Sequence, residues 1–233
     1  MLKEKNTYIK ELIKAILVIL FYFISYSYPI DSLTNLLGIK LDTVGKLIAF
    51  SITYEALILA VIIYVYKKEL STMFKDYKAN FKEYMNKYFK YWILILILML
   101  VSNMVITQFT VSETSNNQEI IIDTLKSAPL YIIITTIFIA PLLEETIFRF
   151  CIRKIIPKFD ILYIIVSGIL FGSLHVILTF NDITDLLFII PYSIPGIIFA
   201  YLYSKTKNIF VPTSIHFIHN GVLILLEIVL NLV

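Results

Sequence analysis

Charge is scarce in this sequence, because Asp, Glu, Lys and Arg together make up only 16% of its 233 residues. Soluble domains carry about a quarter charged residues, so this shortage argues against a soluble globular protein. Apolar residues instead reach 59%, and the mean hydropathy is +0.84. The net charge of +3 is too small to indicate a nucleic-acid partner. These values predict an integral membrane protein whose most general partner is the surrounding lipid.

Cysteine and histidine are scarce as well. The single cysteine, Cys151, excludes an internal disulfide, and with only Arg153 as a basic neighbour in its helix it is expected to be a buried, inert thiol. The three histidines, His175, His216 and His219, all fall in or beside the last three apolar runs. Ionisable residues in a membrane are costly and usually face a cavity or one another, so these histidines are candidates for function.

The apolar runs predict an all-α fold, a polytopic transmembrane helix bundle of about seven spans. The first run follows several lysines but lacks a small-residue cleavage site, so we expect an uncleaved span rather than a signal peptide. The polar stretches N-N-Q and I-P-K-F-D are expected to be connecting loops. The expected spans are approximately Ile13–Ile30, Gly45–Tyr66, Tyr91–Val111, Pro129–Ile152, Ile161–Phe180, Leu186–Tyr203 and Ile209–Val233.

Basic residues gather in alternate connections between these spans. The N-terminus and the connections after the second, fourth and sixth spans are rich in Lys or Arg, whereas the connections between them are acidic or sparse. Because basic connections stay on the cytoplasmic side, this asymmetry predicts a multi-pass cell-membrane protein with a cytoplasmic N-terminus and an external C-terminus. An even number of spans would reverse the C-terminus.

The basic connection at residues 67–90 has a pattern of its own. Its aromatic residues recur every three or four positions among seven lysines, as in a helix that lies in the headgroup region. The simpler alternative is a solvated cytoplasmic helix. The aromatic residues concerned are Phe74, Tyr77, Phe81, Tyr84 and Tyr88.

The fourth expected span contains two adjacent carboxylates and an arginine, which lipid tolerates poorly. Glu145 and Arg149 are one turn apart on one helix face, where they can form an ion pair. Glu144 lies about 100° around the helix from Glu145, and Pro141 is expected to kink the helix one turn earlier. The pattern therefore predicts a locally paired Glu145 and a Glu144 that is free for another partner.

The expected partner of Glu144 is His175. Each lies about 15 residues from the turn between their spans, so an antiparallel hairpin places both at a similar depth, about 22 Å from its tip. His216 and Asn220 share one face of the last span, whereas His219 points elsewhere. A carboxylate near an imidazole can take a proton from water, and an imidazole with an amide can donate to a developing oxyanion. Together these residues indicate a hydrolytic site without a side-chain nucleophile.

Three short motifs in this order resemble those of the CPBP family, the CAAX proteases and bacteriocin-processing enzymes. This family is also called Abi and includes the eukaryotic Ras-converting enzyme. The motifs are E-E-x-x-x-R from Glu144, F-x-x-x-H ending at His175 and H-x-x-x-N from His216, and they fall within residues 141–220. The resemblance implies a catalytic core at residues 128–233, in the last four spans. Residues 1–127 would then supply N-terminal spans and the basic connecting helix.

The resemblance further implies an intramembrane glutamic endopeptidase with a cytoplasm-facing cavity and no metal or other cofactor. Glu144 would be the general base that activates water together with His175. His216 and Asn220 would form the oxyanion hole, while Glu145 and Arg149 would support the site and the substrate. The substrate would be a membrane-associated peptide or protein, such as a prenylated protein, a bacteriocin or a signalling peptide. The residue pattern sets neither the substrate's identity nor the oligomeric state.

Other functions also accommodate these residues. His175, His216 and Glu144 could bind zinc, although no H-E-x-x-H motif is present. A non-catalytic bacteriocin-immunity or membrane-partner-binding protein is a further alternative, as is a transporter with a proton relay. A rhomboid-type serine protease fits poorly, because no G-x-S-x-G surrounds Ser173. The remaining intramembrane carboxylates, Glu55 and Glu227, are expected to be structural.

Overall fold

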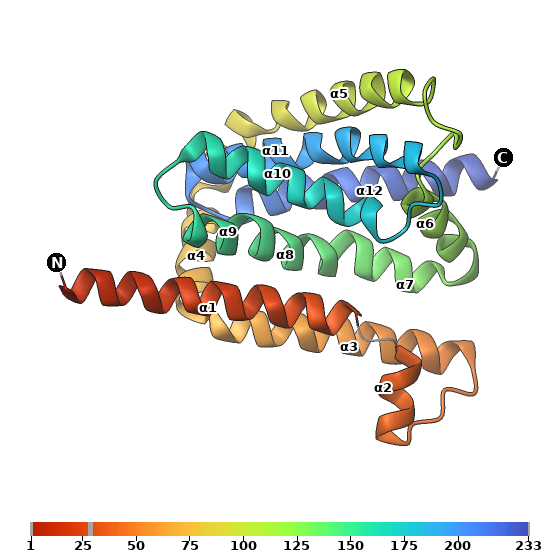
Figure 1. Ribbon diagram of the computed structural model, residues 1–233, viewed down its shortest axis with the longest axis horizontal. Coiled ribbons are helices and arrows are strands. Elements are labelled where there is room, and N and C mark those ends of the chain that lie inside the picture. Colours follow the sequence, from red (N-terminus) through yellow and green to blue (C-terminus); the bar gives the residue numbers. More distant parts are fainter. Residues whose placement is uncertain (1, 28–29, 233) are drawn as a thin grey trace.

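The computed structural model describes residues 2–27 and 30–232, and every regular element within these ranges is a helix (Figure 1). The predicted all-α fold is therefore confirmed. The N-terminal elements are α1 (Leu2–Ser27), α2 (Ile30–Leu37), α3 (Val44–Val65), α4 (Lys67–Tyr88), α5 (Lys90–Ile106) and α6 (Asn116–Ser127). The C-terminal elements are α7 (Pro129–Ile134), η1 (Thr135–Ile139), α8 (Ala140–Glu144), η2 (Glu145–Cys151), α9 (Ile152–Ile155), α10 (Asp160–Ile177), η3 (Ile183–Phe188), α11 (Ile189–Thr206) and α12 (Phe210–Leu232).

Fewer helices than the expected seven are long and apolar enough to cross a membrane. In the described ranges five segments qualify on their own, and six do if the bent pair of α4 and α5 counts as one span. The α1 helix does not qualify, because Lys10, Glu11 and Lys14 interrupt its apolar run. Even so, α1 and α5 run alongside the other long helices (Figure 1). The qualifying segments are Val44–Val65, Pro129–Ile155, Asp160–Ile177, Ile183–Thr206 and Phe210–Leu230.

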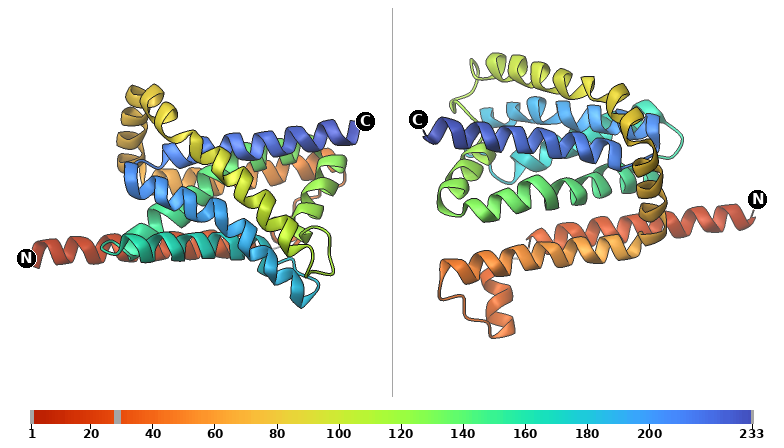
Figure 2. Two further views of the ribbon diagram at one scale, coloured as in Figure 1. Left: turned by 90° about the horizontal axis from the view of Figure 1, so that it is seen from above. Right: turned by 180° about the vertical axis from the view of Figure 1, so that it is seen from behind.

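The basic segment does form a helix, α4, which stands across one end of the bundle rather than along it (Figure 2). Asn208, between α11 and α12, anchors it by donating to the Met73 carbonyl and to Asp76, each at 2.7 Å. Tyr84 also donates to Asp76 at 2.7 Å, and these hydrogen bonds hold the pKa of that carboxyl below its usual value. The interfacial placement of α4 remains a prediction, which this transverse orientation suits.

Residues 129–155 form one continuous helical segment from α7 to α9, which we call the rod. In place of the kink expected at Pro141, the rod contains π-helical turns on both sides of the proline. Proline lacks the N–H that would bond to the preceding turn. The rod accommodates it with two π-helical segments, η1 before the proline and η2 after it. Such segments are rare and occur often at functional sites. Here η2 contains both Glu145 and Arg149.

The α10 and α11 helices pack unusually closely, because glycines line their contact. A Cβ atom added to Gly168 would lie 2.3 Å from Ile197 Cγ1, and one added to Gly172 would lie 2.3 Å from Ser193 Oγ. Both distances are impossible for real atoms, so only glycine permits this approach. The G-x-x-x-G spacing is a known solution for close helix packing in membranes. It sets the position of the α10 face that carries Phe171 and His175.

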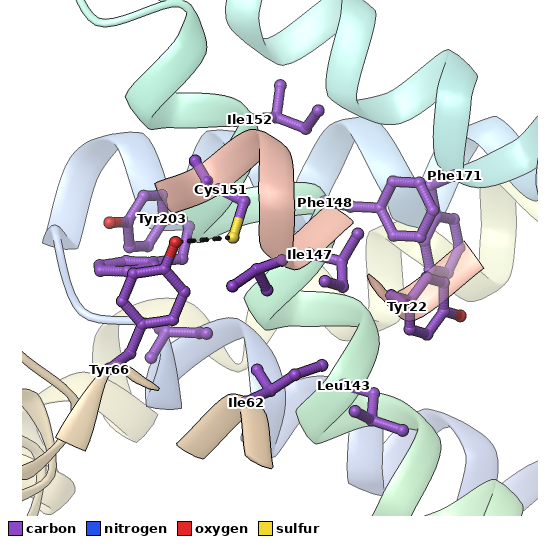
Figure 3. Close-up of a cluster of buried hydrophobic side chains, with 14 of the residues drawn as sticks. Tyr22, Ile62, Tyr66, Leu143, Ile147, Phe148, Cys151, Ile152, Phe171 and Tyr203 are labelled. Carbon is purple, nitrogen blue, oxygen red and sulfur yellow. Dashed lines mark hydrogen bonds between the residues drawn. The ribbon is translucent and has the colours of Figure 1, made fainter. Parts of the chain in front are cut away.

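The main apolar core lies where α1 and α3 pack against the rod (Figure 3). Leu143, Ile147 and Cys151 are fully buried on the rod, and Ile62 on α3 and Tyr66 directly after α3 face them. The Cys151 thiol lies 3.5 Å from the Tyr66 hydroxyl, to which it donates. Cys151 is thus buried, as predicted, and this core packs against the rod that carries the polar residues described next.

Candidate active site

The first part of the site is the predicted ion pair within η2. Arg149 Nε lies 2.9 Å from Glu145 Oε2, and both side chains are completely buried. The guanidinium also faces the rings of Phe171 at 4.6 Å and Phe199 at 5.5 Å, which are cation–π distances. Among the described residues, its two terminal nitrogens have no hydrogen-bond partner. Its charge is therefore balanced chiefly by Glu145, which makes this carboxylate a fixed anion.

His216, on α12, extends the pair toward a second helix. Its Nδ1 lies 3.0 Å from Glu145 Oε1. A carboxylate only accepts hydrogen bonds, so Nδ1 carries the proton and donates it. The ring stacks on Phe199 with centroids 4.8 Å apart, which fixes its plane. The arrangement resembles a carboxylate–histidine pair, in which the acid orients the ring and stabilises its charged form.

Glu144 lies on the other side of His216. Its Oε2 is 3.8 Å from His216 Nε2, and its side chain is 12% exposed. No hydrogen bond or ion pair joins Glu144 directly to His175 in the described part of the chain, so their partnership stays a prediction. The two carboxylates instead approach the same imidazole, because Glu144 ends α8 where the π-helical turn begins and both residues face α12.

His175 is held separately, on α10. Its Nδ1 donates to the Phe171 carbonyl at 2.9 Å, since a carbonyl can only accept. Its ring packs against Phe171 at 4.7 Å and stacks on Tyr192 at 5.0 Å. Phe171 also contacts the ring of His216, with centroids 5.7 Å apart. The two histidines thus belong to one cluster, and His175 has Nε2 left as the nitrogen that can accept a proton.

The amide of Asn220 points toward the rod, on the same side as His216. Its Nδ2 donates to the Thr136 carbonyl in η1 at 2.8 Å, which leaves one amide proton for another acceptor. The predicted shared face of His216 and Asn220 is confirmed, because both side chains bind residues of the rod. His219 is also buried, and its Nδ1 has no partner among the described residues. The sequence pattern did not indicate Thr136, Tyr192 or Phe199.

The arrangement brings acids, bases and donors together in a largely dry place. Arg149, Glu145, His216 and Glu144 follow one another as a row of neighbours, and His175 presents a second imidazole beside it. Such a row can take a proton from water and can donate hydrogen bonds to an oxyanion. In the described residues, no group of three His, Cys, Asp or Glu side chains is placed to hold a metal ion.

An apolar cavity of about 220 Å³ is lined by residues that neighbour this row along the chain. It lies between α3, α4, α8, η2 and α12. Thr146 lines it next to Glu145, and Thr213 lines it one turn before His216. Nearly all the remaining lining is hydrocarbon, apart from Lys67 and Ser71 on α4. The cavity can therefore hold an apolar group close to the polar residues.

Comparison with known proteins identifies relatives of the C-terminal half. Residues 126–222 match the family model of the type II CAAX prenyl endopeptidase Rce1-like proteins. The chain is 31% identical over 122 residues to a Bacillus subtilis (strain 168) protein named as membrane peptidase YdiL. It is 31% identical over 144 residues to the membrane-embedded CAAX protease MroQ of Staphylococcus aureus (strain USA300). No solved structure gives a significant match.

These matches are partial in both directions. The YdiL match covers 52% of this chain and 46% of that protein, and the MroQ match covers 58% and 55%. The chain thus spans about half the length of the curated relatives it matches. The matched region of the family model includes the rod, α10, α11 and most of α12, and hence every residue of the polar row. Residues 126–222 of this polytopic membrane protein are therefore similar to the Rce1-like CAAX prenyl endopeptidase family.

Proposed function

We propose that the chain is an intramembrane endopeptidase that hydrolyses a peptide bond with water activated by Glu144 and His175. The observation that carries this proposal is the buried row Arg149–Glu145–His216–Glu144 within the Rce1-like domain. Building such a row inside apolar helices is costly, and intramembrane charges usually mark functional sites. Residues 128–233 would form the catalytic core, and residues 1–127 would cover and support it.

The proposed reaction uses each group at a stated atom. Glu144 takes a proton from water as the water oxygen attacks the peptide carbonyl, and it later returns that proton to the leaving amine. His175 assists through Nε2, the ring nitrogen that is free to accept from the same water. His216 donates Nδ1–H to Glu145, and Asn220 donates its second amide proton to the oxyanion. The proposal requires His216 to take a second proton on Nε2, which it would then donate to the oxyanion.

Glu145 and Arg149 would act through His216 rather than on the substrate. Glu145 carries a fixed negative charge against Nδ1, so it stabilises the charged ring at the moment when the oxyanion forms. Arg149 in turn holds Glu145 in place. Because both side chains are fully buried, neither can reach a substrate without movement of the helices around them. Their burial therefore favours a supporting role for Glu145 and Arg149 over direct contact with the substrate.

The cavity next to the row favours a substrate with an apolar part. A hydrocarbon chain would bury its surface in this space, at about 25 cal/mol per Å² of apolar area removed from water. The family name and the relative named as a CAAX protease both suggest a prenylated peptide or protein as the class to test first. Bacteriocins and signalling peptides remain candidates of the same general kind.

The proposed orientation places the α4 end of the bundle in the cytoplasm. The beginning of α1, all of α4, and the connections before α10 and before α12 lie at this end (Figure 1). They contain most of the lysines and arginines, as cytoplasmic segments do. An opening of the site toward the same end would give the cytoplasm-facing cavity expected for this family.

The test compares wild type with Glu144→Gln in proteoliposomes, using a quenched fluorescent farnesylated peptide that ends in a C-a-a-X sequence. Glu144→Gln keeps the size of the side chain and is expected to lower kcat by at least about 100-fold. Glu55→Gln is the matched control, because Glu55 is another intramembrane carboxylate but binds Tyr131 at 2.7 Å instead. It is expected to retain activity.

Peptide mass spectrometry of host membranes extends this test to unknown substrates. Fragments that appear with wild type and vanish with Glu144→Gln would identify the natural substrate. A Glu144→Gln variant that accumulates normally and leaves both assays unchanged would refute the catalytic proposal in favour of a non-catalytic immunity or binding protein. Loss of activity on chelation, with stoichiometric zinc in the purified protein, would instead support the zinc hydrolase.

A further inference from the structure

Tyr192 on α11 connects His175 to a part of the chain outside the proposed catalytic row. Its ring stacks on the His175 imidazole with centroids 5.0 Å apart and planes at 14°. Phe171 packs against the same imidazole at 4.7 Å and also binds its Nδ1 through the carbonyl oxygen. Two aromatic contacts and one hydrogen bond therefore determine where His175 Nε2 points.

The position of Tyr192 is set in turn by the beginning of α6. Its hydroxyl lies 2.8 Å from Ser115 Oγ and 3.3 Å from Asn117 Nδ2. Asn117 donates to the hydroxyl, and Ser115 already accepts from the Gln118 N–H as the N-cap of α6. A consistent assignment therefore has Tyr192 donating to Ser115, so the hydroxyl is held at both its donor and its acceptor positions.

The same segment also holds the backbone near His175. Asn116 Nδ2 donates to the Thr179 carbonyl at 2.7 Å, and Thr179 Oγ1 donates to the His175 carbonyl at 3.3 Å. Residues 115–117 thus fix His175 in two ways, its ring through Tyr192 and its helix end through Thr179. These residues lie before the region matched by the family model, which begins at residue 126.

We infer that Tyr192, anchored by Ser115 and Asn117, is a positioning residue that orients the His175 imidazole for the reaction. This inference rests on the proposed function, because the orientation of His175 affects catalysis only if its Nε2 acts on the water. Within a catalytic site, a displacement of about 1 Å can lower the rate by up to about 100-fold. Tyr192 is placed to prevent such a displacement without touching the substrate.

The direct test is ¹⁵N NMR of the full chain labelled at its three histidines, in lipid nanodiscs. His175→Gln assigns the His175 signals by their disappearance. Wild type is expected to show the Nδ1–H tautomer at His175. Tyr192→Leu is expected to shift the His175 signals toward a mixture of tautomers, and the His216 and His219 signals should change less. Tyr201→Leu is the matched control, because Tyr201 also lies on α11 but its hydroxyl faces Tyr91 at 3.4 Å.

Kinetics on the farnesylated peptide supply the second readout. Tyr192→Leu is expected to lower kcat about tenfold or more with little change in KM. Tyr192→Phe keeps the stacking and loses only the hydroxyl anchor, so a smaller loss, about 2- to 10-fold, is expected. The double variant of Ser115→Ala and Asn117→Ala should match Tyr192→Phe, because it removes the same anchor from the other side.

The outcomes separate this inference from the proposed function. If Glu144→Gln retains full activity, the proposed function fails. If Glu144→Gln loses activity while His175→Gln retains it, the positioning role of Tyr192 fails alone. If His175→Gln loses activity while Tyr192→Leu keeps normal kcat, the positioning role is refuted. An unchanged His175 tautomer in Tyr192→Leu, or a change no larger than in Tyr201→Leu, refutes it as well, whatever the activity.

Discussion

The buried pair of Glu145 and Arg149 allows a sharp test of how this site is held together. Glu145→Gln keeps an amide oxygen that can accept from His216 Nδ1, but it removes the charge that balances Arg149. Since Arg149 is completely buried and has no other ion-pair partner in the described residues, its charge becomes uncompensated. Removing one partner of a buried pair costs about 3–5 kcal/mol of unfolding free energy. Arg149→Met should lower the unfolding free energy by a similar amount, because it leaves the buried Glu145 carboxylate without its partner.

The double variant distinguishes pairing from general damage. Replacing both partners by neutral groups of similar size leaves no stranded charge, and it can be nearly neutral for stability. We therefore expect the double variant to lose at least about 2 kcal/mol less than the sum of the two single variants. The measurement is reversible unfolding in mixed micelles, followed by circular dichroism and by protease resistance. Additive losses would refute the pairing.

The chain offers a matched control with the same spacing. Lys46 and Asp42 are also four residues apart, with Nζ and Oδ1 separated by 2.6 Å, but their side chains are 57% and 63% exposed. Water screens this pair, so Asp42→Asn should cost only about 0.3–0.5 kcal/mol. The comparison keeps the four-residue spacing and places a buried pair beside an exposed one. A similar cost at both pairs would mean that burial does not determine the contribution of Glu145.

Further predictions concern helix packing, the cavity and the anchoring of α4. Gly172→Leu should prevent folding, because a Cβ atom alone would lie 2.3 Å from Ser193 Oγ, while Gly45→Leu meets nothing within 4 Å and should fold, as membrane accumulation will show. Leu142→Trp should fill part of the cavity and raise KM for the farnesylated peptide with little effect on kcat. Asp76 has a lowered pKa, so its contribution to stability is complete above its unfolded pKa near 3.8 and is lost as the pH falls through the folded value. As the pH falls below about 3.8, wild type should therefore lose more stability than Asp76→Asn in unfolding measurements.

Local spacing predicted the parts of the site that lie within one helix. The Glu145–Arg149 pair and the common face of His216 and Asn220 follow from residues one turn apart, and both are present. The Glu145–Arg149 pair forms even though η2 is π-helical, because the two residues still lie within a single turn of the rod. Long apolar runs predicted the helices for a similar reason, since backbone groups in lipid must be satisfied within the helix.

Relations between helices were less predictable. The pairing of Glu144 with His175 rested on counting residues from a turn, which fixes depth but not the rotation of each helix. Rotation depends on packing, and here Gly168 and Gly172 bring α10 against α11 while α12 places His216 next to Glu144. The G-x-x-x-G pattern was present in the sequence as a signal for the first contact. No comparable signal marked the second.

The N-N-Q stretch shows a signal that was available but overlooked. Residues 116–118 were expected to form a loop, yet they are the first turn of α6. Ser115 followed by Gln118 has the S-x-x-Q spacing of a helix start, and in the structure Ser115 Oγ accepts from the Gln118 N–H at 3.2 Å. This correction matters for the site, because the same turn anchors Tyr192. The contact between Ser115 and Tyr192 could not be predicted from spacing, since the two residues are 77 positions apart.

The order of charges explains how so polar a group survives among apolar helices. Arg149 and Glu145 cancel each other, so the next charge in the row, on Glu144, needs a balancing cation nearby. In the proposed mechanism a His216 that carries a second proton would supply it, with Nδ1 against Glu145 and Nε2 facing Glu144 at 3.8 Å. When Glu144 took a proton from water its charge would disappear, and the His216 cation would then be free to face the oxyanion instead. Under this proposal the same imidazole would balance the negative charge before and after it moves from the carboxylate to the substrate, and this would give His216, rather than either carboxylate, the central place in the row.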